Sequence, residues 1–156
     1  LKLEWHFIGP IQANKTRPIA ERFAWVHSVD RLKVAERLSA QRPDSLPPLN
    51  LCLQVNISRE ASKHGLGVAE VPAIAKAVSA LPRLRLRGLM AIPAPATGFD
   101  AQREPLARLR LLQERLIAEG LPLDTLSMGM TEDLEAAIAE GSTLARIGTA
   151  IFGPRA

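Results

Sequence analysis

The chain has 156 residues, 47% of them hydrophobic and 23% charged, which is enough for one domain and argues against intrinsic disorder. No apolar run approaches the roughly 18 residues that a membrane span needs. The net charge is +4, but most arginines stand at helical spacing beside Glu or Asp, and aromatic residues make up only 4%. We therefore expect solvated helix faces and no nucleic-acid partner.

The single cysteine, Cys52, lies within an apolar run from Leu49 to Val55. One thiol cannot form an internal disulfide, and its setting is typical of a buried strand position. A cytoplasmic location is expected on this ground. The chain starts at Leu1, directly before a strand-like run, and this predicts that an upstream segment is absent.

Short β-type runs alternate with longer amphipathic runs along the whole chain. Helices are expected over 14–22, 30–40, 71–81, 101–119 and 132–140, with Asp30 as the N-cap of the second. Strands are expected near six residues, which are Trp5, Val26, Leu51, Leu86, Leu126 and Ala145.

Strict alternation of strand and helix favours an all-parallel sheet with helices outside it. An open doubly wound sheet is the alternative to a parallel β/α barrel of the TIM type, but the phosphate-loop patterns GxGxxG and GxxxxGK[ST] are absent. Six strands cannot close an eight-stranded barrel. We therefore expect residues 1–156 to form one domain containing strands 3 to 8, with about two βα units missing at the front.

Two short motifs at strand ends point to phosphate chemistry. Ser127, Met128 and Gly129 end one expected strand just before a helix, where backbone N–H groups attract anions. Arg146, Gly148 and Thr149 end the next strand, and the loops after the last two strands of a barrel commonly build a phosphate site. Taken singly, either motif is explained by turn and capping residues, but together they favour a bound phosphate.

The chain resembles the pyridoxal phosphate homeostasis protein family. Four ordered runs carry the resemblance, which are 5–15, 87–92, 127–131 and 146–153. It implies a fold-type III pyridoxal-phosphate barrel, similar to the N-terminal domain of alanine racemase. It also implies pyridoxal 5′-phosphate binding in vitamin B6 homeostasis and cofactor supply, without established catalysis.

The resemblance also implies roles for individual residues. Ser127, Gly148 and Thr149 match phosphate-holding positions, and Arg146 matches the arginine that faces the pyridine nitrogen. Because arginine stays protonated, it disfavours a protonated pyridine ring. The whole expected cofactor-binding set is Asn14, Met90, Ser127, Met128, Gly129, Arg146, Gly148 and Thr149.

The family's Schiff-base lysine lies upstream of the first run and is expected to be absent from this chain. Lys15 and Lys63 follow strands on the correct side, but neither matches that position. The resemblance further implies a monomer in full-length form, and cofactor-accepting apoenzymes as partners. A pyridoxal-phosphate racemase is the alternative function, which the lack of tyrosine disfavours. No metal site is expected, because the histidines form no ligand cluster.

Overall fold

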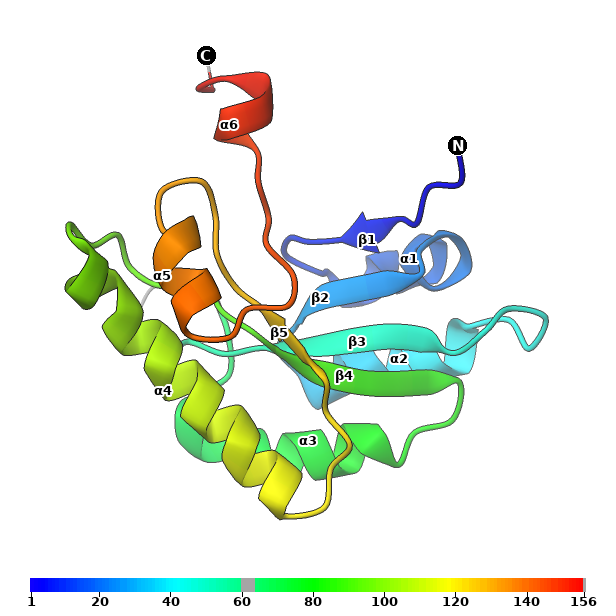
Figure 1. Cartoon of the computed structure of the whole chain (residues 1–156). Helices are drawn as coiled ribbons and strands as arrows, with labels where there is room; N and C mark the ends of the chain where they lie inside the picture. Colours follow the sequence, from blue (N-terminus) through cyan, green and yellow to red (C-terminus); the bar gives the residue numbers. More distant parts are fainter. Residues whose placement is uncertain (60–63, 156) are drawn as a thin grey trace.

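Short strands alternate with helices in the computed structural model, which describes residues 1–59 and 64–155 (Figure 1). The strands are β1 (His6–Phe7), β2 (Trp25–Val29), β3 (Leu49–Gln54), β4 (Leu84–Met90) and β5 (Thr125–Ser127). The α-helices are α1 (Thr16–Arg22), α2 (Leu32–Gln41), α3 (Val71–Ser79), α4 (Phe99–Ala118), α5 (Leu134–Ala139) and α6 (Thr149–Phe152). Short 3-10 turns precede α1 and α3, at Ala13–Lys15 and Val68–Glu70.

The five strands form one parallel sheet in the order β1-β2-β3-β4-β5. Sequential order with every pair parallel confirms the β/α reading and excludes a nucleotide-type strand order. The sheet curls like part of a barrel wall, and α2, α3 and α4 cover its outer face (Figure 1). Further βα units that would close the barrel stay a prediction.

Alternate residues of the strands pack into two different layers. Leu51 and Leu53 of β3 belong to the large core between the sheet and the helices. Cys52, which lies between them, packs with Trp25 and Met90 in a smaller cluster on the concave side. The central strand β3 is therefore buried on both faces, which explains its largely apolar sequence.

Gly88 permits a close approach between β4 and β5. A Cβ atom at this position would collide with the backbone carbonyl oxygen of Thr125 and come within 2.8 Å of Oε1 of Gln113. That Gln113 oxygen instead accepts a hydrogen bond from the backbone N–H of Leu89, at 2.9 Å. Only glycine fits here, so the spacing of β4 and β5 depends on it.

The structure corrects the expectation of a sixth strand near Ala145. Only Leu144 pairs with the sheet, through a single parallel bridge to Ser127. The hydroxyl of Thr143 accepts from the backbone N–H of Leu126 at 2.9 Å, and that of Ser142 donates to the carbonyl of Met128 at 2.6 Å. These side chains occupy backbone groups that a longer ladder would need, so regular pairing ends at Leu144, and the backbone N–H of Arg146 donates to the carbonyl of Gly129 instead.

The expected N-cap of α2 is also wrong. The residue before the helix is Arg31, whose backbone is extended, and no side chain caps the helix start. The guanidinium of Arg31 donates to the carbonyl of Ile11 at 2.7 Å, which fixes this corner in the extended conformation. Asp30 lies one residue too early and instead faces Arg31 at 3.6 Å.

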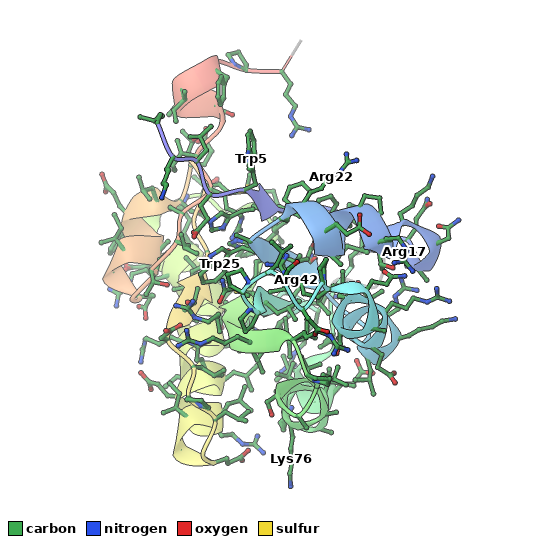
Figure 2. The ribbon with its side chains drawn as sticks, turned by 90° about the vertical axis from the view of Figure 1, so that its right-hand side faces the viewer. Trp5, Arg17, Arg22, Trp25, Arg42 and Lys76 are labelled. Carbon is green, nitrogen blue, oxygen red and sulfur yellow. The ribbon has the colours of Figure 1, made fainter. Side chains whose placement is uncertain are left out.

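Some of the basic side chains lie on helix faces, as their spacing predicts, but fewer than half of the 20 Lys and Arg residues belong to the described α-helices. Arg17, Arg22 and Lys76 project away from the fold in Figure 2, whereas Trp25 and Arg42 lie within it. The exposed cations of α1 and α4 pair with acids one turn away, in the pairs Arg17–Glu21, Arg108–Glu104, Arg110–Glu114 and Arg115–Glu119. Such pairs stabilise a helix by a few tenths of a kcal/mol each, roughly.

Candidate functional site

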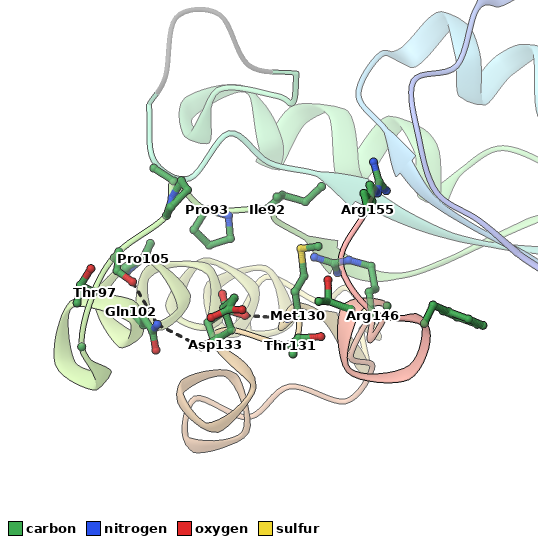
Figure 3. A pocket seen from close by; sticks show the side chains of 18 of the residues that line it. Ile92, Pro93, Thr97, Gln102, Pro105, Met130, Thr131, Asp133, Arg146 and Arg155 are labelled. Atoms are coloured by element: carbon green, nitrogen blue, oxygen red, sulfur yellow. Dashed lines mark hydrogen bonds between the residues drawn. The ribbon is translucent and has the colours of Figure 1, made fainter.

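A cavity of about 810 Å³ lies at the carboxyl ends of β4 and β5. Three segments and the start of α4 enclose it, namely residues 92–98, 130–133 and 146–155 (Figure 3). The carboxyl ends of parallel strands are where barrel proteins place their ligands, because the loops there converge. The volume is that of a small-molecule site, for which roughly 300–1,000 Å³ is typical.

Arg146 is the half-buried cation of this cavity. Its Nη1 donates to Oγ of Ser127 at 2.7 Å and its Nη2 to the carbonyl of Ala91 at 2.9 Å. Its own backbone N–H donates to the carbonyl of Gly129 at 2.8 Å. Within residues 1–59 and 64–155, no carboxylate lies at ion-pair distance from the guanidinium. Burial lowers the pKa of Arg146, yet an arginine stays charged at neutral pH.

Hydroxyl and glycine residues stand next to Arg146 in the lining. Thr131 follows β5, while Gly148 and Thr149 open the short helix α6. The hydroxyl of Thr131 accepts from the backbone N–H of Ala150 at 3.2 Å, which ties the two segments together. The hydroxyls and backbone N–H groups make a site for an anion with several oxygens, and the guanidinium stands beside it in the same lining.

The opposite wall of the cavity is largely apolar. Ile92 and Pro93 come from the segment after β4, and Figure 3 shows them facing the Thr131 side. The amide nitrogen of Gln102 donates to the carbonyls of Ala96 at 3.1 Å and of Glu132 at 3.2 Å. This side chain therefore braces both loops across the cavity mouth. An apolar wall opposite a charged one suits a flat ring that carries an anionic group.

A polar chain lies beneath Arg146, on the concave side of the sheet. Nδ1 of His27 lies 2.6 Å from Oγ of Ser127, and its Nε2 lies 2.8 Å from Nδ1 of His6. His27 is 2% exposed and Ser127 fully buried. Burial, followed by the charges of His6 and Arg146, lowers the pKa of His27 to about 4, so this imidazole is neutral at neutral pH.

The structure brings only part of the expected site residues together. Arg146, Gly148 and Thr149 share the cavity wall. Met90 and Met128 are fully buried, in the concave cluster and in the main core respectively. Gly129 also lies outside the described lining, and a Cβ atom added there would lie only 2.6 Å from Cβ of Ala137. Asn14 is exposed in the turn before α1 and lies outside the described lining as well.

Ser127 is expected to hold the phosphate through its hydroxyl. Its hydroxyl is taken up by His27 and Arg146, and it is not part of the lining that the structure describes. Its direct role at a phosphate stays a prediction. Of its own motif, Thr131 is the hydroxyl residue that reaches the cavity.

Sequence reasoning named Thr131 within the motif after β5 but did not assign it to the site, and it assigned no role to His27 or Arg155. Thr131 stands four residues after Ser127, so a count of which residues lie past the strand end would have found it. His27 shares its strand face with Trp25, and a period of two predicts that it points to the concave side. No local pattern marks Arg155, which reaches the cavity because the chain turns back after α6.

No lysine belongs to the lining that residues 1–59 and 64–155 supply. Lys15 lies in the turn before α1, and Lys63 lies outside the described residues. In the same ranges, no group of three or more His, Cys, Asp or Glu side chains is placed to hold a metal ion. No helix of this part is long and apolar enough to cross a membrane.

Comparisons with known proteins show the family of the chain. Residues 2–156 match the family model described as alanine racemase, N-terminal domain. The chain is 66% identical over 155 residues to the pyridoxal phosphate homeostasis protein of Pseudomonas aeruginosa, and 56% identical over 153 residues to that of Escherichia coli. The two matches include 99% and 98% of this chain, and they span 66% and 65% of the lengths of the two relatives.

Solved structures extend the likeness to the fold. PipY of Synechococcus elongatus with PLP bound is 37% identical, with a TM-score of 0.86 over 97% of this chain and 71% of that one. PipY without PLP gives a TM-score of 0.88 over the same shares. An alanine racemase from Clostridium difficile shares 12% identity and a TM-score of 0.78 over 99% of this chain and 41% of its own, which shows a common fold alone.

Proposed function

The chain belongs to the alanine racemase N-terminal domain family, and on this premise we propose that it binds pyridoxal 5′-phosphate in the Arg146 cavity. We assign it a carrier role in cofactor homeostasis, in keeping with the name of its relatives. The observation that carries the proposal is a guanidinium without a carboxylate partner in the described structure, beside two hydroxyl residues and a glycine, in a cavity of suitable size.

The lining residues fit the two ends of this cofactor. Thr131, Gly148 and Thr149 offer hydroxyl and backbone N–H donors to the phosphate, and Arg155 adds a positive charge nearby. Arg146 would face the ring nitrogen, and the apolar segment at Ile92 and Pro93 would cover one side of the ring.

Arg146 has a chemical as well as a geometric role in the proposal. A guanidinium donates to a neutral ring nitrogen and opposes its protonation, because two positive charges would then stand side by side. When bound, the cofactor itself supplies an aldehyde and an electron-withdrawing ring. This chain's residues hold the phosphate, orient the ring and shield one of its faces.

The wider role is also part of the proposal. A protein that holds the cofactor by its phosphate and ring can release it to cofactor-requiring apoenzymes, which are the partners we infer. A cytoplasmic location and a monomeric complete protein belong to the same proposal, and the unpaired buried thiol of Cys52 is compatible with a reducing compartment.

Equilibrium titration with pyridoxal 5′-phosphate, pyridoxal and inorganic phosphate tests this function. We expect the phosphate ester to bind more tightly than pyridoxal. Thr131→Val should weaken the ester by about fivefold to thirtyfold, the worth of one charge-assisted hydrogen bond, and leave pyridoxal unaffected. Ser79→Ala on α3, whose hydroxyl only reaches the carbonyl of Lys76, is the control. Equal binding of pyridoxal and its phosphate ester would contradict the proposal.

A further inference from the structure

Arg146 is a charged group held by neutral acceptors. Its guanidinium donates to Oγ of Ser127 and to the carbonyl of Ala91. A cation that is not fixed by a carboxylate keeps more of its field available to a ligand, but its orientation then depends on these weaker partners. What holds Ser127 in place therefore decides where the guanidinium points.

Behind Ser127, a continuous chain of hydrogen bonds crosses the concave side of the sheet. It runs from Arg146 to Ser127 at 2.7 Å and from Ser127 to His27 at 2.6 Å. It continues from His27 to His6 at 2.8 Å, and from Nε2 of His6 to Oε1 of Glu4 at 3.3 Å. Ser127 ends β5 at one edge of the sheet, whereas His6 lies in β1 at the other.

With both imidazoles neutral, the two ends of the chain fix every proton between them. The carboxylate of Glu4 can only accept, so Nε2 of His6 donates to it. Nδ1 of a neutral His6 then accepts from Nε2–H of His27. Nδ1 of a neutral His27 accepts in turn from the hydroxyl of Ser127.

At the other end, the guanidinium can only donate. The hydroxyl oxygen of Ser127 must therefore accept from Arg146 while its proton goes to His27. One tautomer of each imidazole satisfies every link. His27 accepts from Ser127 and His6 accepts from His27, and the Ser127 hydroxyl becomes a better acceptor for the arginine because its own proton is engaged.

Ring packing holds the two imidazoles in this alignment. The ring of His6 stacks on Trp25 with centroids 5.2 Å apart and an interplanar angle of 5°. The rings of Trp25 and His27 lie 5.9 Å apart, and the guanidinium carbon of Arg87 lies 4.6 Å from the centre of the Trp25 ring. Packed side chains of this kind lose little further freedom when a ligand arrives.

We propose that His27, backed by His6, is the positioning residue that orients Arg146 toward the ring nitrogen of an aromatic phosphate ligand, acting through the hydroxyl of Ser127. This inference rests on the proposed function for the identity of the ligand. It gives a role to the buried histidines that no phosphate contact explains. It also assigns the Ser127 hydroxyl to the ring end of the site.

The first test compares pyridoxal 5′-phosphate with its 1-deaza analogue, in which C–H replaces the ring nitrogen. The wild-type chain should prefer the nitrogen compound by about tenfold, since one charge-assisted hydrogen bond distinguishes them. His27→Leu should reduce this preference to about twofold, with inorganic phosphate binding unchanged. His27→Asn should retain most of the preference, because its Oδ1 stands near the position of the lost Nδ1 and can accept from Ser127.

A second readout needs no ligand. Nitrogen-15 NMR should give resolved Nη signals for Arg146 in the wild-type chain and in His27→Asn, and averaged signals in His27→Leu because the guanidinium then rotates freely. Gln113→Leu, which removes another buried polar side chain, this one on α4 and bonded to Leu89 of β4, is the matched control and should keep the resolved signals. If His27→Leu does not fold, Ser127→Ala replaces it in both experiments.

The outcomes separate the two proposals. Loss of the ring-nitrogen preference and of the resolved signals in His27→Leu supports the positioning role. An unchanged preference in His27→Leu, or equal binding of both compounds by the wild type, overturns it while pyridoxal 5′-phosphate binding stands. If the wild type binds neither compound, the proposed function fails, and resolved Arg146 signals in His27→Leu would overturn the positioning role as well.

Discussion

Mild acid should destabilise the folded chain, because the folded state keeps the imidazole of His27 neutral. Its pKa is lowered to about 4 by burial, by His6 and by Arg146, whereas an unfolded histidine titrates near 6.5. The unfolded state therefore binds more protons between these two values. The stability that neutral His27 contributes is fully present above about pH 6.5 and is lost as the pH falls toward 4.

The size of the effect follows from the two pKa values. Linkage gives a loss of about 2 kcal/mol between about pH 7 and about pH 5, and about 3 kcal/mol when His27 is fully protonated. For a domain of this size, 2 kcal/mol is a large share of the total stability. Urea unfolding followed by tryptophan fluorescence at a series of pH values measures it, with the slope against urea checked for constancy.

Variants isolate the contribution of His27 to the pH dependence of the free energy of unfolding. His27→Leu removes the titrating group from both states, so its free energy of unfolding should change little over this range, whatever its starting value. His64→Gln removes an exposed histidine and should keep the wild-type pH dependence. Carboxylates such as Glu140 have lowered pKa values and act mainly below about pH 4.5, so they do not obscure the window. If the free energy of unfolding depended on pH equally in the wild type and in His27→Leu, the reasoning would be refuted.

Three further predictions concern packing and buried charge. Gly88→Ala should cost at least about 2 kcal/mol in urea unfolding, because its Cβ meets the carbonyl of Thr125 between two strands, and a smaller cost would show that the strands can part. Glu140→Gln should lower the free energy of unfolding by about 1–3 kcal/mol. It should also reduce the loss of stability in stronger acid, because Arg103 holds the pKa of Glu140 low, and an unchanged loss in acid would contradict this role of Glu140. Burial raises the pKa of Cys52 to about 12, so alkylation of this thiol should follow global unfolding across urea concentrations, and rapid labelling of the native chain would contradict its burial.

Much of the architecture could be predicted from the sequence, because strand and helix signals alternate without a hairpin turn. The run around Leu51 is largely apolar and buried on both faces, as is typical of a parallel strand inside a β/α fold. The run at 144–147 is expected to form a strand as well, yet it forms a single bridge. The hydroxyls of Ser142 and Thr143 compete for the backbone groups of β5, and such side-chain competition has no signature in hydrophobic periodicity.

The site could be predicted only in part. Arg146, Gly148 and Thr149 follow one another in sequence, so a motif finds them together. Ser127 and Thr131 belong to a second motif, but which of them reaches the cavity depends on how the chain turns after β5, and the motif alone did not decide it. The bonds from His6 to His27 and from His27 to Ser127 join residues 21 and 100 positions apart, and only the folded sheet brings them together.

A crystal structure of the chain with pyridoxal 5′-phosphate tests the central claim most directly. We expect the phosphate between Thr131 and Thr149, within hydrogen-bond reach of the backbone N–H groups at Gly148 and Thr149, and the ring nitrogen facing the guanidinium of Arg146. The bond from Arg146 to Ser127 should persist in the complex. A cofactor bound elsewhere, or one bound here with its phosphate against Arg146 and its ring away from it, would contradict the account.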